Sequence, residues 1–154
     1  MSKPVILKPS SLGDIIEIQG LKIQIPKKPP KKKILFSDKK KKEQKWIRQD
    51  MPSGLSRETS PDYYEYIEEE FKRRAEGLWF MNNGEATYIT GSHYMFIQWS
   101  NIDVGYPDYR DANRKFFLFW EACKIDPNCM GMCFLKNRRS GFSYMASSEM
   151  VNQA

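Results

Sequence analysis

The residues best suited to chemistry lie together in the loop from Lys136 to Ser143. The order Lys-Asn-Arg-Arg-Ser-Gly-Phe-Ser can be laid on the phosphate-binding pattern G-x-x-x-x-G-K-[ST], with Gly141 and Ser143 in register. Lys136 replaces the first glycine of the pattern, and Phe142 replaces its lysine. Because a lysine has a long flexible stem, Lys136 can bring the same ammonium group to the same phosphates from the entrance of the loop. The spacing therefore predicts a loop that binds phosphate groups.

Two elements must position this loop. The apolar run 132–135 predicts a short buried strand before it, and residues 143–151 predict a helix after it. Ser143, the first residue of that helix, can also cap it. A helix start has unpaired N–H groups and a partial positive charge, and both stabilise an anion.

The expected cofactors are ATP and Mg²⁺. We expect Lys136 to neutralise charge on the β- and γ-phosphates, and the backbone of Gly141, Phe142 and Ser143 to cradle them. The hydroxyl of Ser143 is the expected magnesium ligand. Two further cations, Arg138 and Arg139, follow in the loop, and either guanidinium can sense the γ-phosphate in the bidentate manner that arginine favours.

The loop resembles the deviant Walker A motif of tailed-phage terminase large subunits, in which the lysine commonly stands at the loop entrance. The residues upstream are similar to the lead-in of large terminases from crAss-like gut phages, and they comprise residues 88–99, Tyr109-Arg110-Asp111 and Phe116-Phe117. The resemblance covers residues 77–154, about half of the chain. It implies an α/β fold, namely the N-terminal part of a doubly wound αβα P-loop NTPase domain, incomplete and preceded by a flexible basic arm.

The resemblance also implies a function, which is the ATP-binding part of a motor that pumps viral DNA into preformed capsids. Tyr109 and Arg110 become candidates for the adenine pocket, with Gln98 and Trp99 behind them. The implied partners are double-stranded DNA, the portal of the procapsid, the small terminase subunit and sibling copies in a ring. The implied locations are the cytoplasm of the infected bacterium and the portal vertex.

Catalysis by such motors also requires acidic residues on later strands. None can follow the loop before Ala154, so we expect a truncated chain that does not hydrolyse ATP alone.

The positive charge belongs to the N-terminal third of the chain. Residues 1–50 hold thirteen Lys and one Arg against five acids, a net charge of +9, which leaves −3 for the rest of a chain of net charge +6. Residues 1–25 predict a small hairpin that turns at Gly20, and residues 26–58 predict an extended, lysine-rich flexible arm. Such an arm either binds polyanions or serves as a solvated linker.

Residues 59–154 are expected to form the lead-in and the first strand, loop and helix of the ATPase domain. A helix begins with Ser60 as its cap and ends before Gly77, and another is capped by Asp111 and runs to about Lys124. Residues 87–89 and 94–99 predict two adjacent strands with His93 at the turn between them, where it caps the turn or makes hydrogen bonds.

Two other classes of protein remain open. One is a basic nucleic-acid-binding or scaffold protein that uses no nucleotide, and the other is a different P-loop NTPase, such as a helicase or a small-molecule kinase. The three cysteines match no common zinc pattern, so reduced structural cysteines are expected, with Cys133 in the buried strand. No apolar run approaches the roughly 20 residues that span a bilayer, so we expect a soluble protein with no membrane partner.

Overall fold

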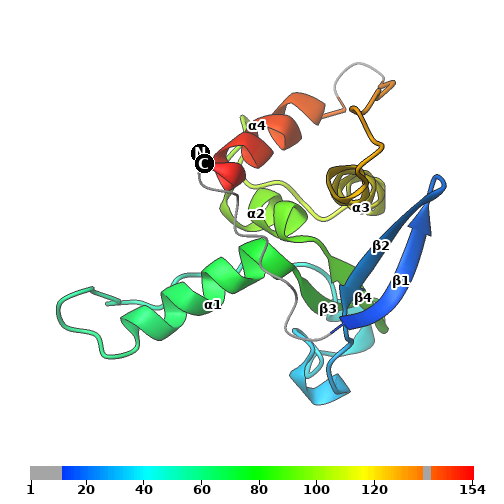
Figure 1. Cartoon of the computed structure of the whole chain (residues 1–154). Coiled ribbons are helices and arrows are strands. Elements are labelled where there is room, and N and C mark those ends of the chain that lie inside the picture. Colours follow the sequence, from blue (N-terminus) through cyan, green and yellow to red (C-terminus); the bar gives the residue numbers. More distant parts are fainter. Residues whose placement is uncertain (1–11, 137–139) are drawn as a thin grey trace.

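A computed structural model of the chain describes residues 12–136 and 140–154. Within these residues the fold is mixed α/β, with four α-helices and two small antiparallel sheets (Figure 1). The helices are α1 (Tyr63–Glu76), α2 (Gly91–Trp99), α3 (Asp111–Ile125) and α4 (Phe142–Gln153). The strands are β1 (Leu12–Ile18), β2 (Leu21–Pro26), β3 (Leu78–Asn82) and β4 (Glu85–Ile89), and two 3₁₀ turns, η1 (Lys31–Lys33) and η2 (Lys41–Glu43), lie between β2 and α1.

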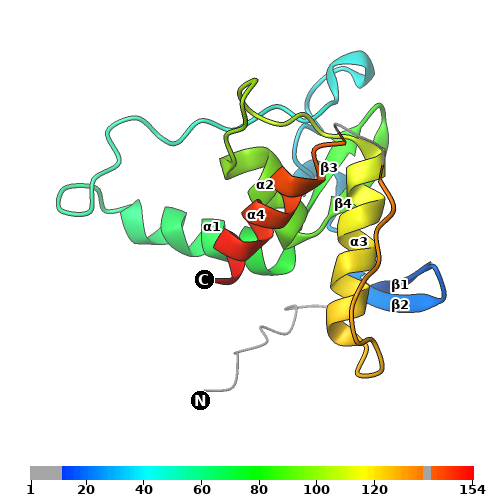
Figure 2. The ribbon, with the colours of Figure 1, turned by 90° about the horizontal axis from the view of Figure 1, so that it is seen from above.

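The first sheet is the predicted hairpin, which turns at Gln19 and Gly20. Both turn residues have positive φ, 49° and 82°, as a tight two-residue hairpin turn requires. Strand β2 packs on α3, where Ile23 and Ile25 form a buried cluster with Leu118. Figure 2 shows the hairpin beside that helix. The prediction of a hairpin is confirmed, and α3 is the element that covers it.

The second sheet pairs β3 with β4 through the turn Asn83-Gly84, whose φ angles are 50° and 90°. Only the β4 half of this hairpin was predicted, because the second strand was placed at residues 94–99. An Asn-Gly pair between two apolar runs is a strong hairpin signal, and it could have located β3. The hairpin is central to the molecule, since Phe80 and Ile89 are fully buried.

Residues 94–99 belong to α2, so the prediction of a strand there is wrong. Thr90 caps this helix, its hydroxyl accepting a hydrogen bond of 3.2 Å from the His93 N–H. A Cβ atom at Gly91 would lie 1.9 Å from the Arg74 carbonyl oxygen, so only glycine lets α2 start against the end of α1. Almost every residue of α2 is buried, and a helix that is apolar all round cannot be told from a buried strand by its periodicity.

The helices α1 and α3 lie close to where the sequence placed them. Gly77 follows the last residue of α1, as predicted, but Ser60 does not cap that helix. The helix begins at Tyr63, after Asp62, and the Ser60 hydroxyl oxygen accepts its hydrogen bond from the Ser56 N–H instead. Asp111 is the first helical residue of α3 rather than its cap, and the helix ends at Ile125, one residue after the predicted end at about Lys124.

The core also contains part of the lysine-rich segment that was predicted to be a flexible arm. Ile34 and Phe36 are buried in the main cluster, Trp46 packs against it, and Leu35 pairs its backbone with Phe80 of β3. The segment is therefore anchored to the domain by the apolar residues between its lysines. Of the ten lysines in residues 26–45, all but Lys39 are exposed.

A parallel sheet, which a doubly wound domain requires, is not formed by residues 12–136 and 140–154. None of the helices in the described ranges is both long enough and apolar enough to span a membrane.

Candidate functional site

The helix after the predicted phosphate loop begins at Phe142. Gly141 stands before it in the left-handed conformation (φ 77°, ψ 8°), and no side chain within residues 12–136 and 140–154 caps the helix. The first backbone hydrogen bond of the helix runs from the Met145 N–H to the Gly141 carbonyl, at 3.2 Å. The glycine turn into a helix is as predicted, but the prediction that Ser143 caps it is wrong, because the helix starts one residue earlier and Ser143 lies exposed in its first turn.

Phe142 anchors the start of α4 to the domain. Its ring stacks on Phe134 with the centroids 5.0 Å apart, and it meets Phe116 of α3 edge-on at 5.4 Å. The residue that replaces the usual lysine of the pattern is thus used for packing. Because its ring is packed in this way, Phe142 can contact a phosphate group only through its backbone N–H.

The segment before the loop is not the predicted buried strand. Residues 130–136 form no strand, and the side chains of Met130 and Leu135 are 98% and 94% exposed. Cys133, expected inside the strand, is exposed as well. A strand needs a neighbour to satisfy its backbone groups, and no strand of the described residues lies beside this segment. It therefore runs as extended coil, held by the stacking of Phe134 on Phe142.

Of the predicted phosphate-binding cations, the structure describes Lys136, whose side chain is exposed at the entrance of the loop. Arg138 and Arg139 lie outside the described residues.

The two adenine candidates, Tyr109 and Arg110, line different cavities. Arg110 lines a cavity of about 100 Å³ together with Ser140 and Gly141 of the predicted phosphate loop. Tyr109 lines a larger cavity of about 420 Å³ on the other side of the same chain segment, and Asp108 borders both. The structure therefore brings Arg110, and not Tyr109, to the phosphate loop.

The residues expected behind the adenine candidates are used to hold the fold together. Gln98 exchanges hydrogen bonds with the backbone of Gln49, at 2.6 and 3.0 Å. The indole N–H of Trp99 donates to the buried carboxylate of Glu70 at 3.1 Å.

Tyr109 is fixed by a stack of rings. Its ring lies 5.6 Å from His93, which in turn lies 5.0 Å from Phe117 of α3, and its edge meets Phe80 at 5.1 Å. Burial raises the pKa of the Tyr109 hydroxyl to about 12, helped by the nearby carboxylate of Asp111, whose Oδ1 accepts its hydrogen bond at 3.5 Å. His93 is fully buried within α2 instead of standing at a turn.

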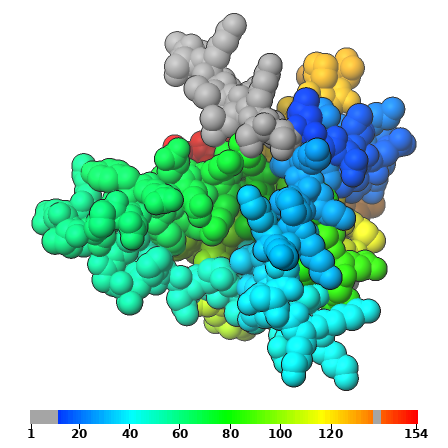
Figure 3. All heavy atoms as spheres, turned by 90° about the horizontal axis from the view of Figure 1, so that it is seen from below, coloured from blue at the N-terminus to red at the C-terminus, as the bar shows by residue number. Residues whose placement is uncertain are grey.

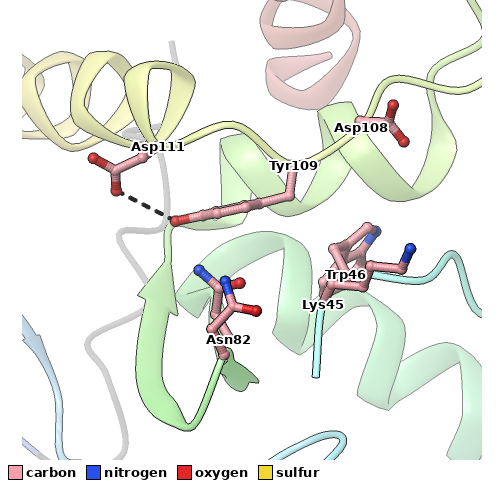
Figure 4. Close-up of a pocket in the computed structure, with 7 residues that line it drawn as sticks. Lys45, Trp46, Asn82, Asp108, Tyr109 and Asp111 are labelled. Carbon is pink, nitrogen blue, oxygen red and sulfur yellow. Dashed lines mark hydrogen bonds between the residues drawn. The ribbon is translucent and has the colours of Figure 1, made fainter. Parts of the chain in front are cut away.

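The larger cavity is a site that the sequence did not reveal. Figure 4 shows Tyr109 along one side of it, with Asn82 and Trp46 facing the same space. The sequence predicts a flexible arm at Lys45 and Trp46, and it predicts no hairpin at Asn83-Gly84. No sequence pattern therefore indicates that these residues lie close together. Its full lining is Lys45, Trp46, Asn82, Asn83, Asp108, Tyr109 and Asp111.

The predicted magnesium ligand, Ser143, has no acidic cluster around it. Within residues 12–136 and 140–154, no three His, Cys, Asp or Glu side chains come together in a way that could hold a metal ion. All three cysteines are free, and burial together with neighbouring Cys129 raises the pKa of Cys123 to about 11, so its thiol stays protonated at neutral pH.

Comparison with known proteins adds no relative, because no protein-family model, curated protein or solved structure matches this chain.

Proposed function

We propose that this chain binds the phosphate groups of ATP with Mg²⁺ at the start of α4, as the nucleotide-binding part of a viral DNA-packaging motor of the terminase large-subunit type. One observation carries the proposal. Arg110, a candidate for the adenine pocket, and Gly141, a candidate for the phosphate loop, lie about thirty residues apart in sequence and line one cavity.

The start of α4 offers donors for an anion. The N–H groups of Phe142, Ser143 and Tyr144 precede the first hydrogen bond of the helix, and no side chain of the described residues caps them. Such groups, together with the helix dipole, stabilise a phosphate group. The cavity of about 100 Å³ is far smaller than typical ligand pockets, so in the proposed complex a phosphate group lies at its edge, beside Arg110 and Gly141, and the rest of the nucleotide lies outside.

Cations at the edge of the cavity supply the remaining charge. Arg110 lines the cavity, and Lys136 enters the loop from the exposed side. In the proposed complex Lys136 neutralises the β- and γ-phosphates, Arg138 or Arg139 senses the γ-phosphate, and the exposed hydroxyl of Ser143 ligates magnesium. Magnesium would neutralise phosphate charge, as it does in P-loop enzymes.

The assignment to a packaging motor rests on the resemblance of residues 77–154 to terminase large subunits. The resemblance places these residues in the N-terminal part of a doubly wound αβα domain. Double-stranded DNA, the portal of the procapsid, the small terminase subunit and sibling copies in a ring are the proposed partners, and the host cytoplasm and the portal vertex are the proposed locations.

The test is the binding of a fluorescent ATP analogue with Mg²⁺, followed by anisotropy. We expect Lys136→Ala and Arg110→Ala each to weaken binding by about tenfold, because each removes a charge-assisted contact worth about 1.5–3 kcal/mol. The matched control is Lys33→Ala, an exposed lysine of η1. Binding by the unaltered chain that neither variant weakens would contradict the proposal, as would no binding at all.

A further inference from the structure

We propose that the cavity between the lysine-rich segment and the β3–β4 turn binds an unpaired nucleobase with an exocyclic amine, as part of a single-stranded nucleic acid whose phosphates lie on the neighbouring lysines. The inference does not depend on the ATP site at α4. It follows from the shape of the cavity, its polar groups and the charge beside it.

Two of the seven residues that line the cavity are aromatic, and neighbouring rings hold both in place. Trp46 is held edge-on by Phe36, Phe80 and Tyr94 at centroid distances of 5.4–6.0 Å. Tyr109 is held by its stack on His93 and its contact with Phe80. Aromatic surfaces fixed before binding cost little entropy, and they are the platforms on which single-stranded nucleic acids stack their bases. At about 420 Å³, the cavity has room for a base.

The polar groups of the cavity favour a particular kind of base. Asp111 lines the cavity with a carboxylate, which only accepts hydrogen bonds; its Oδ1 also accepts from the Tyr109 hydroxyl, and its Oδ2 lies 3.3 Å from Lys115 Nζ. Asp108 also lines the cavity, with its carboxylate turned away from Tyr109 (Figure 4), and Asn82 and Asn83 add amides. Adenine, cytosine and guanine carry an exocyclic amine that can donate to a carboxylate, whereas thymine and uracil carry carbonyl groups there. The exposed lysines beside the cavity attract a phosphate more strongly than a lining that contains two aspartates, so we place the sugar-phosphate backbone outside the cavity.

The structure places lysines where that backbone would run. The Asn83 N–H donates to the Gln44 carbonyl at 2.7 Å, and the Gln44 amide donates to the Lys39 carbonyl at 2.9 Å. The stem of Lys41 lies against Gly84, next to the cavity residue Asn83, since a Cβ atom at Gly84 would come within 2.7 Å of Lys41 Cε.

The lysine-rich segment is thereby clamped beside the cavity, with Lys45 in the cavity lining itself. Figure 3 shows the lysine-rich segment in light blue to cyan at the lower right of the molecule. Exposed lysines next to aromatic platforms are the combination that single-strand-binding proteins use.

The test compares end-labelled oligo(dC) with oligo(dT) of twelve nucleotides by fluorescence anisotropy. These bases differ at the position where cytosine has an amine and thymine a carbonyl, and neither strand stacks strongly on itself. We expect the unaltered chain to bind oligo(dC) about tenfold more tightly than oligo(dT) at the same salt concentration, as one good base contact provides.

Two double variants separate the base contact from the phosphate contacts. Asp108→Asn with Asp111→Asn keeps the size of both side chains but lets the new amides donate, so the preference for oligo(dC) should fall to about twofold or less. Its control, Glu17→Gln with Glu58→Gln, removes the same charge from exposed sites elsewhere and should keep the preference. Lys41→Ala with Lys42→Ala should weaken both strands alike and lower the dependence on salt.

Several outcomes would overturn the proposal. They are equal binding of the two strands by the unaltered chain, an unchanged preference in the aspartate variant once circular dichroism shows it folded, and equal binding of duplex and single-stranded DNA. Free CMP that binds as tightly as oligo(dC) would assign the cavity to a mononucleotide instead. Lys136→Ala should leave oligonucleotide binding unchanged, so the failure of the ATP proposal and the failure of this one are distinguishable.

Discussion

His93 lies at the centre of the molecule without any exposed surface. Its imidazole is stacked between Tyr109 and Phe117, and neither ring nitrogen has a hydrogen-bond partner among the residues that the structure describes. Burial, with a smaller contribution from the positive charge of Arg114, lowers the pKa of His93 to about 3. The side chain is therefore a neutral ring that fills space in an aromatic cluster.

This burial makes the stability of the fold depend on pH. Because the folded-state pKa of about 3 lies below the unfolded value of 6.5, the unfolded chain takes up a proton first as the pH falls, and stability is lost between these two values. We expect His93→Phe to remove a slope of about 1.4 kcal/mol per pH unit between pH 6 and pH 4. Urea unfolding of both proteins at a series of pH values measures the difference, and parallel curves would contradict the expectation.

At the residue scale, the sequence predicted the type of local conformation better than the role of each side chain. Gly141 forms the predicted turn into a helix, since few other residues adopt positive φ at low cost. The roles of Phe142 and Ser143 could not be assigned in the same way, because they depend on Phe116 and Phe134, which reach the start of α4 only in the folded chain.

At the scale of elements, a partly buried ion pair between Lys124 and Glu149 joins α3 to α4. Lys124 Nζ lies 2.9 Å from Glu149 of α4 and 2.8 Å from Glu121 of its own helix. The Glu149 side chain is only 7% exposed, so its carboxylate depends on this lysine for a counter-charge. The contact fixes the helix whose first turn is the proposed phosphate site.

We expect Lys124→Met to lower the free energy of unfolding by about 3 kcal/mol, because it leaves the Glu149 carboxylate buried without its partner. Hydrogen exchange should quicken in α4 more than in α1. The control is Lys115→Met on the same helix, whose ion pair with Asp111 is exposed and should contribute less than about 1 kcal/mol. Equal losses in the two variants, measured by urea unfolding, would contradict this account.

The elements that the sequence located well are those with clear signals at their ends. The hairpin of β1 and β2 and the helices α1, α3 and α4 each have a glycine, a proline or an acidic residue near a boundary. Residues 94–99 and 132–135 are short apolar runs, whose periodicity does not distinguish a buried strand from a buried helix, and the neighbours that decide between strand, helix and coil are distant in sequence. In α2 that neighbour is α1, whereas residues 132–135 have no paired strand among the residues that the structure describes.

At the scale of the whole molecule, the core is built around β3, β4 and α2. Of the segment 130–136, Met132 packs against this core, whereas Met130 and Leu135 are exposed. We expect Leu135→Ser to change the free energy of unfolding by less than about 0.5 kcal/mol, because the side chain is 94% exposed. Ile97→Ala, which opens a cavity beneath α2, should cost about 2–5 kcal/mol. A large loss at Leu135 would mean that this segment is packed as a strand in solution.

The segment between Trp46 and α1 runs out from the core and returns along the tip of that helix (Figure 1). Its first residues are held by Arg48, which donates to the Gln98 carbonyl at 2.9 Å, and by the paired hydrogen bonds between Gln49 and Gln98. The segment leads into α1, and α1 is joined to α2 by a hydrogen bond of 2.6 Å from the Tyr94 hydroxyl to the Glu70 carboxylate. We therefore expect that after a single cut in the backbone between residues 51 and 60 the N-terminal and C-terminal fragments stay bound to each other, with the fold intact.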